Sequence, residues 1–302
     1  MSAAIGTLGK LGIGAASPVT YALDFQSEGI VKRQESVNGN GVRGTRSHTV
    51  ERTRAGLQRI GGPLSLQPNS ADIHQLLPWV LGTNGTVVSG TNKQYILAEG
   101  VQSRYVTVDR HAKVFTYATT GVDRCTIRGD QGALVGFDLD LIAATESVGN
   151  AGTFPAIYTD VTTNPFILSD LTLSVNSTSV TAKGFEVSIS NDIDRDRFFN
   201  SNTLTALVAR DREVTFKTRL PYGDFTALYD LGAATGIAVT ATLTNGTSVM
   251  VVTMPKVVFP PMSPRVEGRT EVMLDLEGRA YRYGDPSDAT KAEIIVTLDT
   301  GA

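Results

Sequence analysis

Short runs in which apolar and polar residues alternate recur along most of the chain. Alternation with a period of two, rich in valine, threonine and isoleucine, is typical of β-strands that bury one face. The clearest runs are residues 105–109, 171–175, 185–189, 214–218, 238–243 and 292–298. The Asn84-Gly85 and Asn245-Gly246 pairs mark two expected hairpin turns. The pattern therefore predicts a mainly β chain.

Helical spacing of apolar residues is found in only two short segments. Residues 70–81 show it, with Ser70 as the expected N-cap, and so do residues 222–231. One short α-helix is therefore expected in each half of the chain.

The two helical segments lie in stretches that resemble one another. Residues 64–79 can be laid on residues 216–231 without a gap, at a shift of about 152 residues, so that Asp72 meets Asp224. An Asn-Gly turn, a strand-rich stretch and an acidic strand then follow in the same order in both halves. This order favours a tandem duplication of one β-rich domain, and two unrelated β domains are the alternative. The expected division is an N-terminal arm at 1–20, a first domain at 21–155 and a second at 156–302.

Two polar loops interrupt the strand pattern, one in each half. Residues 32–62 are basic and rich in glycine, which fits either a long exposed hairpin or a loop that orders on a partner. Residues 191–212 mix both charges. Loops of unlike charge suit docking between neighbouring subunits, and a solvated, salt-bridged surface loop is the alternative. The candidate inter-subunit residues are Arg43, Arg46, Arg52, Arg54, Asp192, Asp194, Arg195, Asp196 and Arg197.

The composition narrows the function classes. The 302 residues carry a formal net charge of −3 and are 41% hydrophobic, which argues for a folded chain and against a globally basic nucleic-acid binder. No apolar run is long enough for a membrane-spanning helix, and the N-terminus lacks the pattern of a signal peptide. Cys125 is the single cysteine, so we expect neither an intrachain disulfide nor a cysteine-based zinc site.

Motifs of catalysis or metal binding are matched only by spacing. Residues 39–44 fit a dinucleotide-binding pattern, but no βαβ unit surrounds them. The alternating aspartates of 192–196 are similar to the start of a calcium loop, but Arg197 stands where that loop needs glycine. The three histidines are isolated in sequence, and Cys125 is expected to be a buried structural thiol. We therefore expect no enzyme, no cofactor and no metal.

Two strands carry acidic residues in alternation with apolar ones. Asp138 and Asp140 do so in the first half, and Asp275 and Glu277 do so in the second. Paired carboxylates can act in acid–base catalysis, but on one strand face they more often point at water. The repetition in both halves needs an explanation other than an active site.

These features together resemble the major tail tube proteins of long-tailed bacteriophages. The resemblance is strongest over residues 43–82, which lead from the polar loop into the first helical segment, and over residues 215–222 in the second half. It implies a mainly β fold of two tandem tail-tube-type β-sandwich or barrel domains, each with one short α-helix, plus extended arms and a long loop. It is a likeness of overall design across most of the chain.

The resemblance also implies a function. In that family each domain adds strands to an inner barrel, the helix lies outside it, and rings stack into a tube that conducts phage DNA during ejection. A chain with two copies then closes a ring as a trimer with pseudo-sixfold symmetry. Its partners would be itself, the tape measure, tail tip and terminator proteins, and DNA as transiting cargo, in a virion tail assembled in the host cytoplasm. The candidate lumen-facing acidic residues are Asp138, Asp140, Asp275 and Glu277.

Two alternatives stay open. Another virion or contractile-injection component, such as a terminator or tail-tip protein, would share much of this design but stop at a single ring. A carbohydrate- or receptor-binding β-sandwich would expose clustered aromatic residues, whereas aromatic residues make up 7% of this chain.

Overall fold

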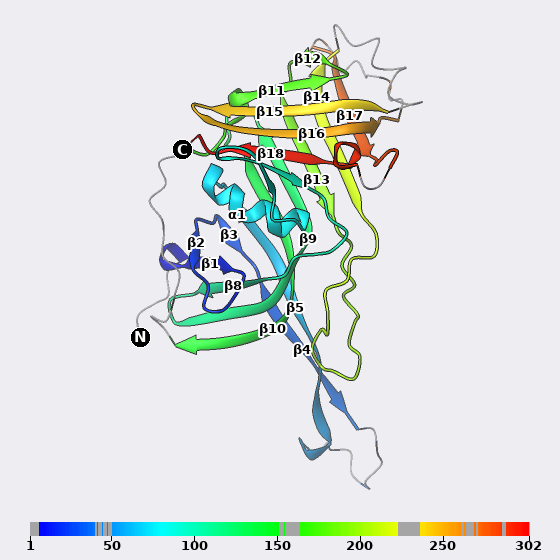
Figure 1. Cartoon of the computed structure of the whole chain (residues 1–302). Coiled ribbons are helices and arrows are strands. Elements are labelled where there is room, and N and C mark those ends of the chain that lie inside the picture. Colours follow the sequence, from blue (N-terminus) through cyan, green and yellow to red (C-terminus); the bar gives the residue numbers. More distant parts are fainter. Residues whose placement is uncertain are drawn as a thin grey trace.

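The computed structural model describes most of the chain. The described residues are 6–39, 41, 44, 47, 50–150, 154, 164–222, 236–260, 263, 269, 271–285 and 288–301. They are mainly β, with a single α-helix among them, as the alternating pattern predicts (Figure 1). Four 3-10 turns complete the described elements: Gly6–Leu8, Val50–Arg52, Leu168–Asp170 and Ala289–Lys291.

One antiparallel layer runs through both halves of the chain. Its strands lie in the order β17 (Met273–Ala280), β14 (Glu213–Pro221), β13 (Gly184–Ser190), β9 (Lys113–Asp130), β10 (Gly136–Asn150) and β5 (Thr53–Leu66). The far edge of β5 pairs with β3 (Ser27–Glu28) and then with β4 (Val31–Asn38). Because β13 pairs with β9 over seven residues, the two halves share one continuous sheet.

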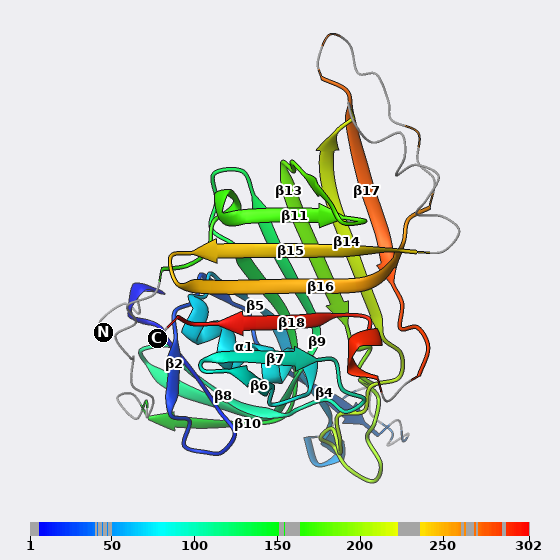
Figure 2. The same cartoon turned by 45° about the horizontal axis from the view of Figure 1, so that its top comes forward.

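A second layer crosses the first at a steep angle (Figure 2). Its order is β12 (Thr178–Val180), β11 (Leu171–Val175), β15 (Ile237–Asn245), β16 (Ser248–Val258), β18 (Ile295–Asp299), β7 (Asn92–Ile96) and β6 (Thr86–Ser89). A smaller group of β2 (Tyr21–Leu23), β1 (Lys10–Gly14) and β8 (Arg104–Asp109) joins the first half of β9. The layers bury a shared apolar core.

The helix α1 (Ser70–Leu81) lies between the layers and is buried along most of its length. Its boundaries agree with the prediction, but its N-cap is Asn69, not Ser70. The Asn69 side chain accepts from the Asp72 amide at 2.9 Å, and the Asp72 carboxylate accepts from the Asn69 amide at 3.3 Å. Ser70 is fully buried, and its hydroxyl bonds that of Ser248 instead. Most of the second predicted helix, at 222–231, lies outside the described residues.

The tryptophan of the chain fixes α1 to the sheet. Trp79 is fully buried, and its indole N–H donates to the Thr120 carbonyl at 2.8 Å. Asn191, from the second half, donates its side-chain amide to the Val122 carbonyl at 2.9 Å and to that of Val80 at 3.4 Å. The helix is therefore held on the apolar face of β9 by both halves of the chain.

Three sequence predictions about connections can be compared with the structure. Asn245-Gly246 lies at a hairpin turn as predicted, between β15 and β16. Asn84-Gly85 does not, because it follows the end of α1, and the β6–β7 turn lies at Gly90 and Thr91. Residues 10–14 of the expected N-terminal arm form β1, which pairs with both β2 and β8 and buries Leu11 and Ile13 completely.

The division into domains at 21–155 and 156–302 stays a prediction. The pairing of strands is nevertheless similar in the two halves. β5 precedes the helix and pairs with the acidic strand β10, while β14 precedes residues 223–235 and pairs with the acidic strand β17.

Candidate functional site

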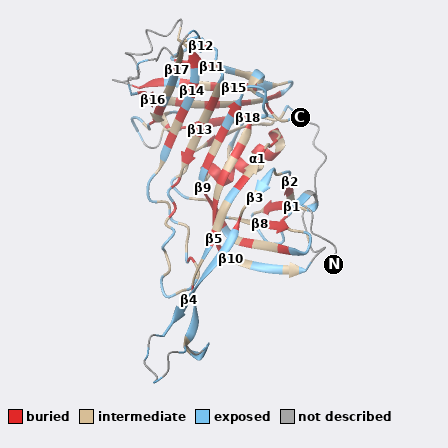
Figure 3. Cartoon of the chain, turned by 180° about the vertical axis from the view of Figure 1, so that it is seen from behind, coloured by how far each residue is buried: buried red, intermediate tan, exposed pale blue. Residues whose placement is uncertain are grey.

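The first layer has one apolar face and one polar face. Buried residues alternate with exposed or half-buried ones over residues 124–130 of β9 and 136–141 of β10, and along the whole of β13 and β14. The buried residues of β17 keep the same spacing of two. The apolar face carries the core and α1, and in the described structure neither α1 nor the second layer covers the opposite face (Figure 3). We call this other side the polar face. Its charged side chains are Arg124, Arg128, Asp130, Asp138, Asp140, Glu186, Glu213, Lys217, Arg219, Asp275, Glu277 and Arg279.

All four predicted acidic residues lie on the polar face, and each is ion-paired with a basic residue of the same chain. Asp138 pairs with Arg128 at 3.1 Å and also accepts from the Ser65 hydroxyl at 2.7 Å. Asp140 accepts from Arg195 at 2.9 Å. In the second half, Lys217 lies 3.0 Å from Glu277, and Arg219 lies 3.4 Å from Asp275.

The polar face is therefore mixed in charge rather than acidic. Three of the basic partners lie on neighbouring strands and were not predicted: Arg128, Lys217 and Arg219. The fourth, Arg195, is a candidate residue of the mixed-charge loop. A further ion pair, between Arg279 and Glu213 at 3.6 Å, extends the pattern along β14 and β17. The alternation of residues 214–218 already placed Lys217 on the polar side of a strand. Its acidic partner could not be predicted, because the partner depends on strand register.

The basic loop at 32–62 is a long hairpin made of β4 and β5. Every residue of β4 is exposed, and the hairpin projects from the body of the molecule (Figure 1). The sequence left open whether this segment would be a hairpin or a loop that orders on a partner, and the structure shows the hairpin. Arg54 is exposed and Arg52 half-buried, and Arg43 and Arg46 lie outside the described residues.

The mixed-charge loop at 191–212 folds onto the base of this hairpin. Asp196 lies 2.7 Å from Arg59, and the Arg195 carbonyl accepts from the same guanidinium at 3.2 Å. Arg195 in turn donates to Asp123 at 2.5 Å. The unlike charges of the two loops thus meet within one chain, where the sequence analysis expected contact between chains.

The remaining candidate residues of this loop also have internal partners. Arg210 donates to Asp192 at 3.1 Å, and the Asp194 carboxylate accepts from the Asp196 amide at 3.0 Å. The guanidinium of Arg197 stacks over the Phe199 ring at 4.9 Å. Each aspartate of the calcium-like pattern is therefore bonded to an arginine or to a backbone amide. The described residues hold no cluster of three or more metal-ligating side chains.

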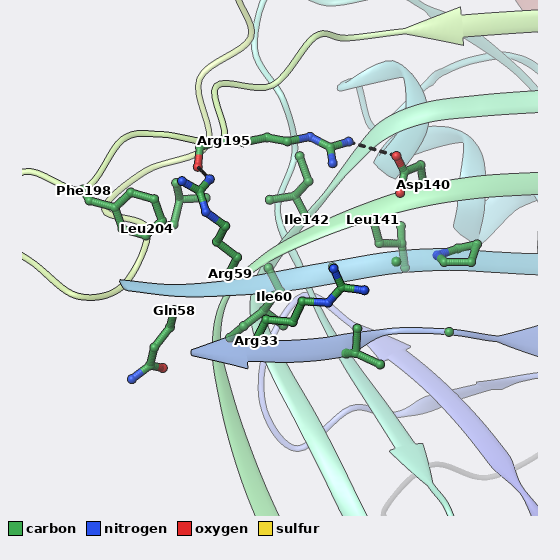
Figure 4. Close-up of a pocket in the computed structure, with 16 residues that line it drawn as sticks. Arg33, Gln58, Arg59, Ile60, Asp140, Leu141, Ile142, Arg195, Phe198 and Leu204 are labelled. Atoms are coloured by element: carbon green, nitrogen blue, oxygen red, sulfur yellow. Dashed lines mark hydrogen bonds and ion pairs between the residues drawn. The ribbon is translucent and has the colours of Figure 1, made fainter. Parts of the chain in front are cut away.

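A cavity of about 340 Å³ lies where the hairpin, β10 and the mixed-charge loop meet (Figure 4). Its floor is apolar, with Ile60, Ile142 and Leu204 among the lining residues. Arginines from the hairpin and from the mixed-charge loop surround it: Arg33, Arg59 and Arg195. The cavity offers no arrangement of a nucleophile with a base.

Two groups with altered titration are structural. Cys125 is fully buried on the apolar face, as predicted, and burial raises the pKa of its thiol far above the ordinary value. Burial first, and then the charge of Lys93, lower the pKa of His74 to about 4. The neutral imidazole lies 2.5 Å from the Tyr95 hydroxyl. Neither group belongs to a catalytic arrangement in the described part of the chain.

Comparison with known proteins identifies the family. A family model described as phage tail tube protein matches residues 6–280, and no curated protein matches the chain. Within the described residues, no helix has the length and apolar character needed to cross a membrane. Because the match spans both halves and the fold is mainly β, the chain belongs to the phage tail tube protein family and is a structural component of the virion tail.

Proposed function

We propose that this chain is the major tail tube subunit, and that its rings stack into a hollow tube that conducts phage DNA during ejection. The observation that carries the proposal is the polar face. It is continuous across both halves, it is backed by a buried apolar face, and it ends in strand edges that are open in the described structure.

The open edges supply a route to ring closure. Among the described residues, the outer edge of β17 pairs with β16 at Arg279 and Ala280 alone, and the outer edge of β4 pairs with no other strand. Exposed strand edges favour aggregation unless they are covered or joined. Joining β17 of one copy to β4 or β3 of the next would extend the sheet into a closed barrel, with the polar face toward the lumen.

The paired charges of the polar face suit a conduit. Duplex DNA is held chiefly by basic groups that replace its counterions. Four basic residues of this face already neutralise a carboxylate: Arg128, Lys217, Arg219 and Arg279. A DNA phosphate would have to displace the carboxylate from its basic partner, so binding of the duplex to this face gains little free energy. The polar face would therefore let DNA slide, and no catalytic or cofactor chemistry is part of the proposal.

The exposed loops would make the contacts between rings. Arg52 and Arg54 are the basic candidates among the described residues, with Arg43 and Arg46 of the segment between β4 and β5, and residues 192–197 supply the mixed-charge ones. The ends of the tube would contact the tape measure, tail tip and terminator proteins. Assembly would take place in the host cytoplasm, before the tail is complete.

Ring symmetry follows from the duplication. If each half is one tube domain, three chains complete a pseudo-sixfold ring; if the halves are unrelated, a ring of six chains is equally open. Negative-stain electron microscopy of the purified chain across a concentration series tests both points. Stacked rings with a central channel are expected, and rotational averaging then counts the chains per turn.

The same experiment separates the alternatives. Single rings that never stack would favour a terminator. A monomer at every concentration, even after addition of a tail-tip complex, would overturn the proposal and favour a binding module.

A further inference from the structure

We propose that residues 193–205 act as a brace that fixes the direction of the β4–β5 hairpin, with Arg59 as the positioning residue between them. The bracing itself is a property of the single chain. Its consequence, that a correctly directed hairpin is needed for ring stacking, rests on the proposed function.

The hairpin has little support of its own. β10 pairs with β5 only as far as Ile60, which lies opposite Ala143. Beyond that point toward the tip, β5 is paired with β4 alone, and all of β4 is exposed. A two-stranded ribbon without an apolar face is at best marginally stable in water. The direction of the hairpin must therefore be set by contacts with another part of the molecule.

Beyond the point where β10 stops pairing with β5, the brace forms hydrogen bonds to the same edge of β5. The backbone amide of Gln58 donates to the Asn202 carbonyl at 2.7 Å. The side-chain amide of Asn202 donates to the Ala55 carbonyl at 3.2 Å. Asn202 therefore bonds to the edge of β5 on the side that has lost its strand partner.

Arg59 makes the side-chain contacts. Its guanidinium lies 2.7 Å from the Asp196 carboxylate, donates to the Arg195 carbonyl at 3.2 Å and lies 5.4 Å from the centre of the Phe198 ring. Three different groups of the brace thus converge on one hairpin side chain, as the close-up in Figure 4 shows for Arg195 and Phe198.

The brace is itself tied to the body of the molecule. The Ile193 amide donates to the Asp123 carboxylate at 2.6 Å, and Arg195 joins Asp123 to Asp140. Leu204 is buried and packs with Ile142 of β10 in a small apolar cluster. Since these anchors lie on β9 and β10, the brace transmits the orientation of the main sheet to the hairpin.

The first test uses amide hydrogen exchange of the full-length monomer. Asp196→Arg would place two guanidinium groups against each other and loosen the brace. The Arg59–Asp196 pair is exposed, at 47% and 76% of the two side chains, so its loss alone is worth at most about 1 kcal/mol, or about a fivefold change in local opening. We expect exchange at residues 53–59 to rise about fivefold or more in Asp196→Arg.

The charge-swapped double variant provides the rescue. Arg59→Asp with Asp196→Arg restores an ion pair of opposite sense, and should return exchange toward the wild-type rate. Asp211→Arg is the matched control, because Asp211 is an exposed aspartate of the same loop outside residues 192–197, and its carboxylate accepts from the Arg212 amide at 2.7 Å. Unchanged exchange in Asp196→Arg, or an equal rise in the control, would overturn the bracing.

The second test follows assembly by electron microscopy. Asp196→Arg should form fewer and shorter tubes than the control at equal concentration, and the double variant should recover them. If the loosened variant assembled as well as wild type, the link between bracing and stacking would be wrong. If wild type itself forms no tubes, the proposed function fails while the exchange experiment still decides whether the brace exists.

Discussion

A buried carboxylate at the start of α1 makes a sharp prediction about pH. Asp72 is 6% exposed and accepts from the Tyr21 hydroxyl at 2.8 Å, which ties β2 to the helix cap. Burial raises the pKa of Asp72 above its ordinary value of 3.8, while the hydrogen bonds from Tyr21 and Asn69 oppose the rise. Burial also raises the pKa of Tyr21 far above its usual range, so the phenol remains a donor.

The sign of the pH dependence follows from linkage. A carboxylate with a raised pKa holds its proton more tightly in the folded state, so stability falls as pH rises from about 3.8 to the folded pKa and is level above it. Tyr21→Phe removes a donor to the ionised form. That raises the pKa of Asp72 further, and the variant must lose more stability at neutral pH than at acid pH.

The magnitude comes from the type of hydrogen bond. A bond to a charged group contributes about 1.5–3 kcal/mol, which corresponds to about one to two pKa units. We expect Tyr21→Phe to lose that amount of unfolding free energy at pH 7 and less once the pH has fallen below the folded pKa of Asp72. Urea denaturation, followed by the fluorescence of the buried Trp79, measures both values.

Tyr95→Phe is the matched control. Tyr95 bonds the neutral imidazole of His74, whose pKa of about 4 leaves it uncharged between pH 5 and 8. The loss caused by Tyr95→Phe should therefore be constant over that range, while the loss caused by Tyr21→Phe should shrink as the pH is lowered through the folded pKa of Asp72. A Tyr21→Phe loss that stays the same from pH 7 to acid pH would show that Tyr21 acts through packing, and would refute the electrostatic argument.

Three further predictions concern assembly and folding. Glutamate at both Arg52 and Arg54 should impair tube formation with a change in monomer stability below about 1 kcal/mol, because neither side chain is in the core; normal tubes by microscopy would argue against a docking role. Deletion of residues 1–15 should lower monomer stability by about 4 kcal/mol or more, because β1 carries two fully buried side chains; an unchanged melting temperature would contradict this. Gly62→Ala should lower the free energy of unfolding by about 1–3 kcal/mol, since Gly62 has φ of 154° and a Cβ there would lie 2.1 Å from the Gly29 carbonyl oxygen. A urea denaturation midpoint equal to that of the wild type would show that the backbone at the base of the hairpin can adjust.

Patterns in short stretches of sequence predicted those helices and strands that are determined by neighbouring residues. The helix at 70–81 follows from its apolar spacing, and strands such as Leu171–Val175 follow from alternation. The N-cap lies one residue earlier than predicted because Asn69 and Asp72 form a reciprocal capping box, a local signal that the apolar spacing does not contain. Ser70 instead bonds Ser248, 178 residues away. The long strand β9 escaped prediction because its alternation breaks near Thr119, where the backbone turns to φ of 51°.

The same limit explains the N-terminal segment. Residues 1–20 are rich in small residues and read as an arm, but β1 gains its burial from β8, almost a hundred residues later. Its two large apolar side chains, Leu11 and Ile13, were the only local sign of a core strand. When a strand is buried by a partner that is distant in the sequence, a short stretch of sequence around the strand does not reveal that burial.

The polar face shows how register converts a sequence pattern into a property that the sequence alone does not contain. Acidic residues on β17 lie opposite basic residues on β14 because Lys217 pairs with Glu277 and Arg219 with Asp275 in the strand ladder. A slip of one residue would move Lys217 and Arg219 to the apolar face, where an unpaired charge is costly. The buried residues that alternate with them therefore fix the register, and the register fixes the charge balance. The core of the chain thus determines the charge balance of the polar face, although no core residue lies on that face.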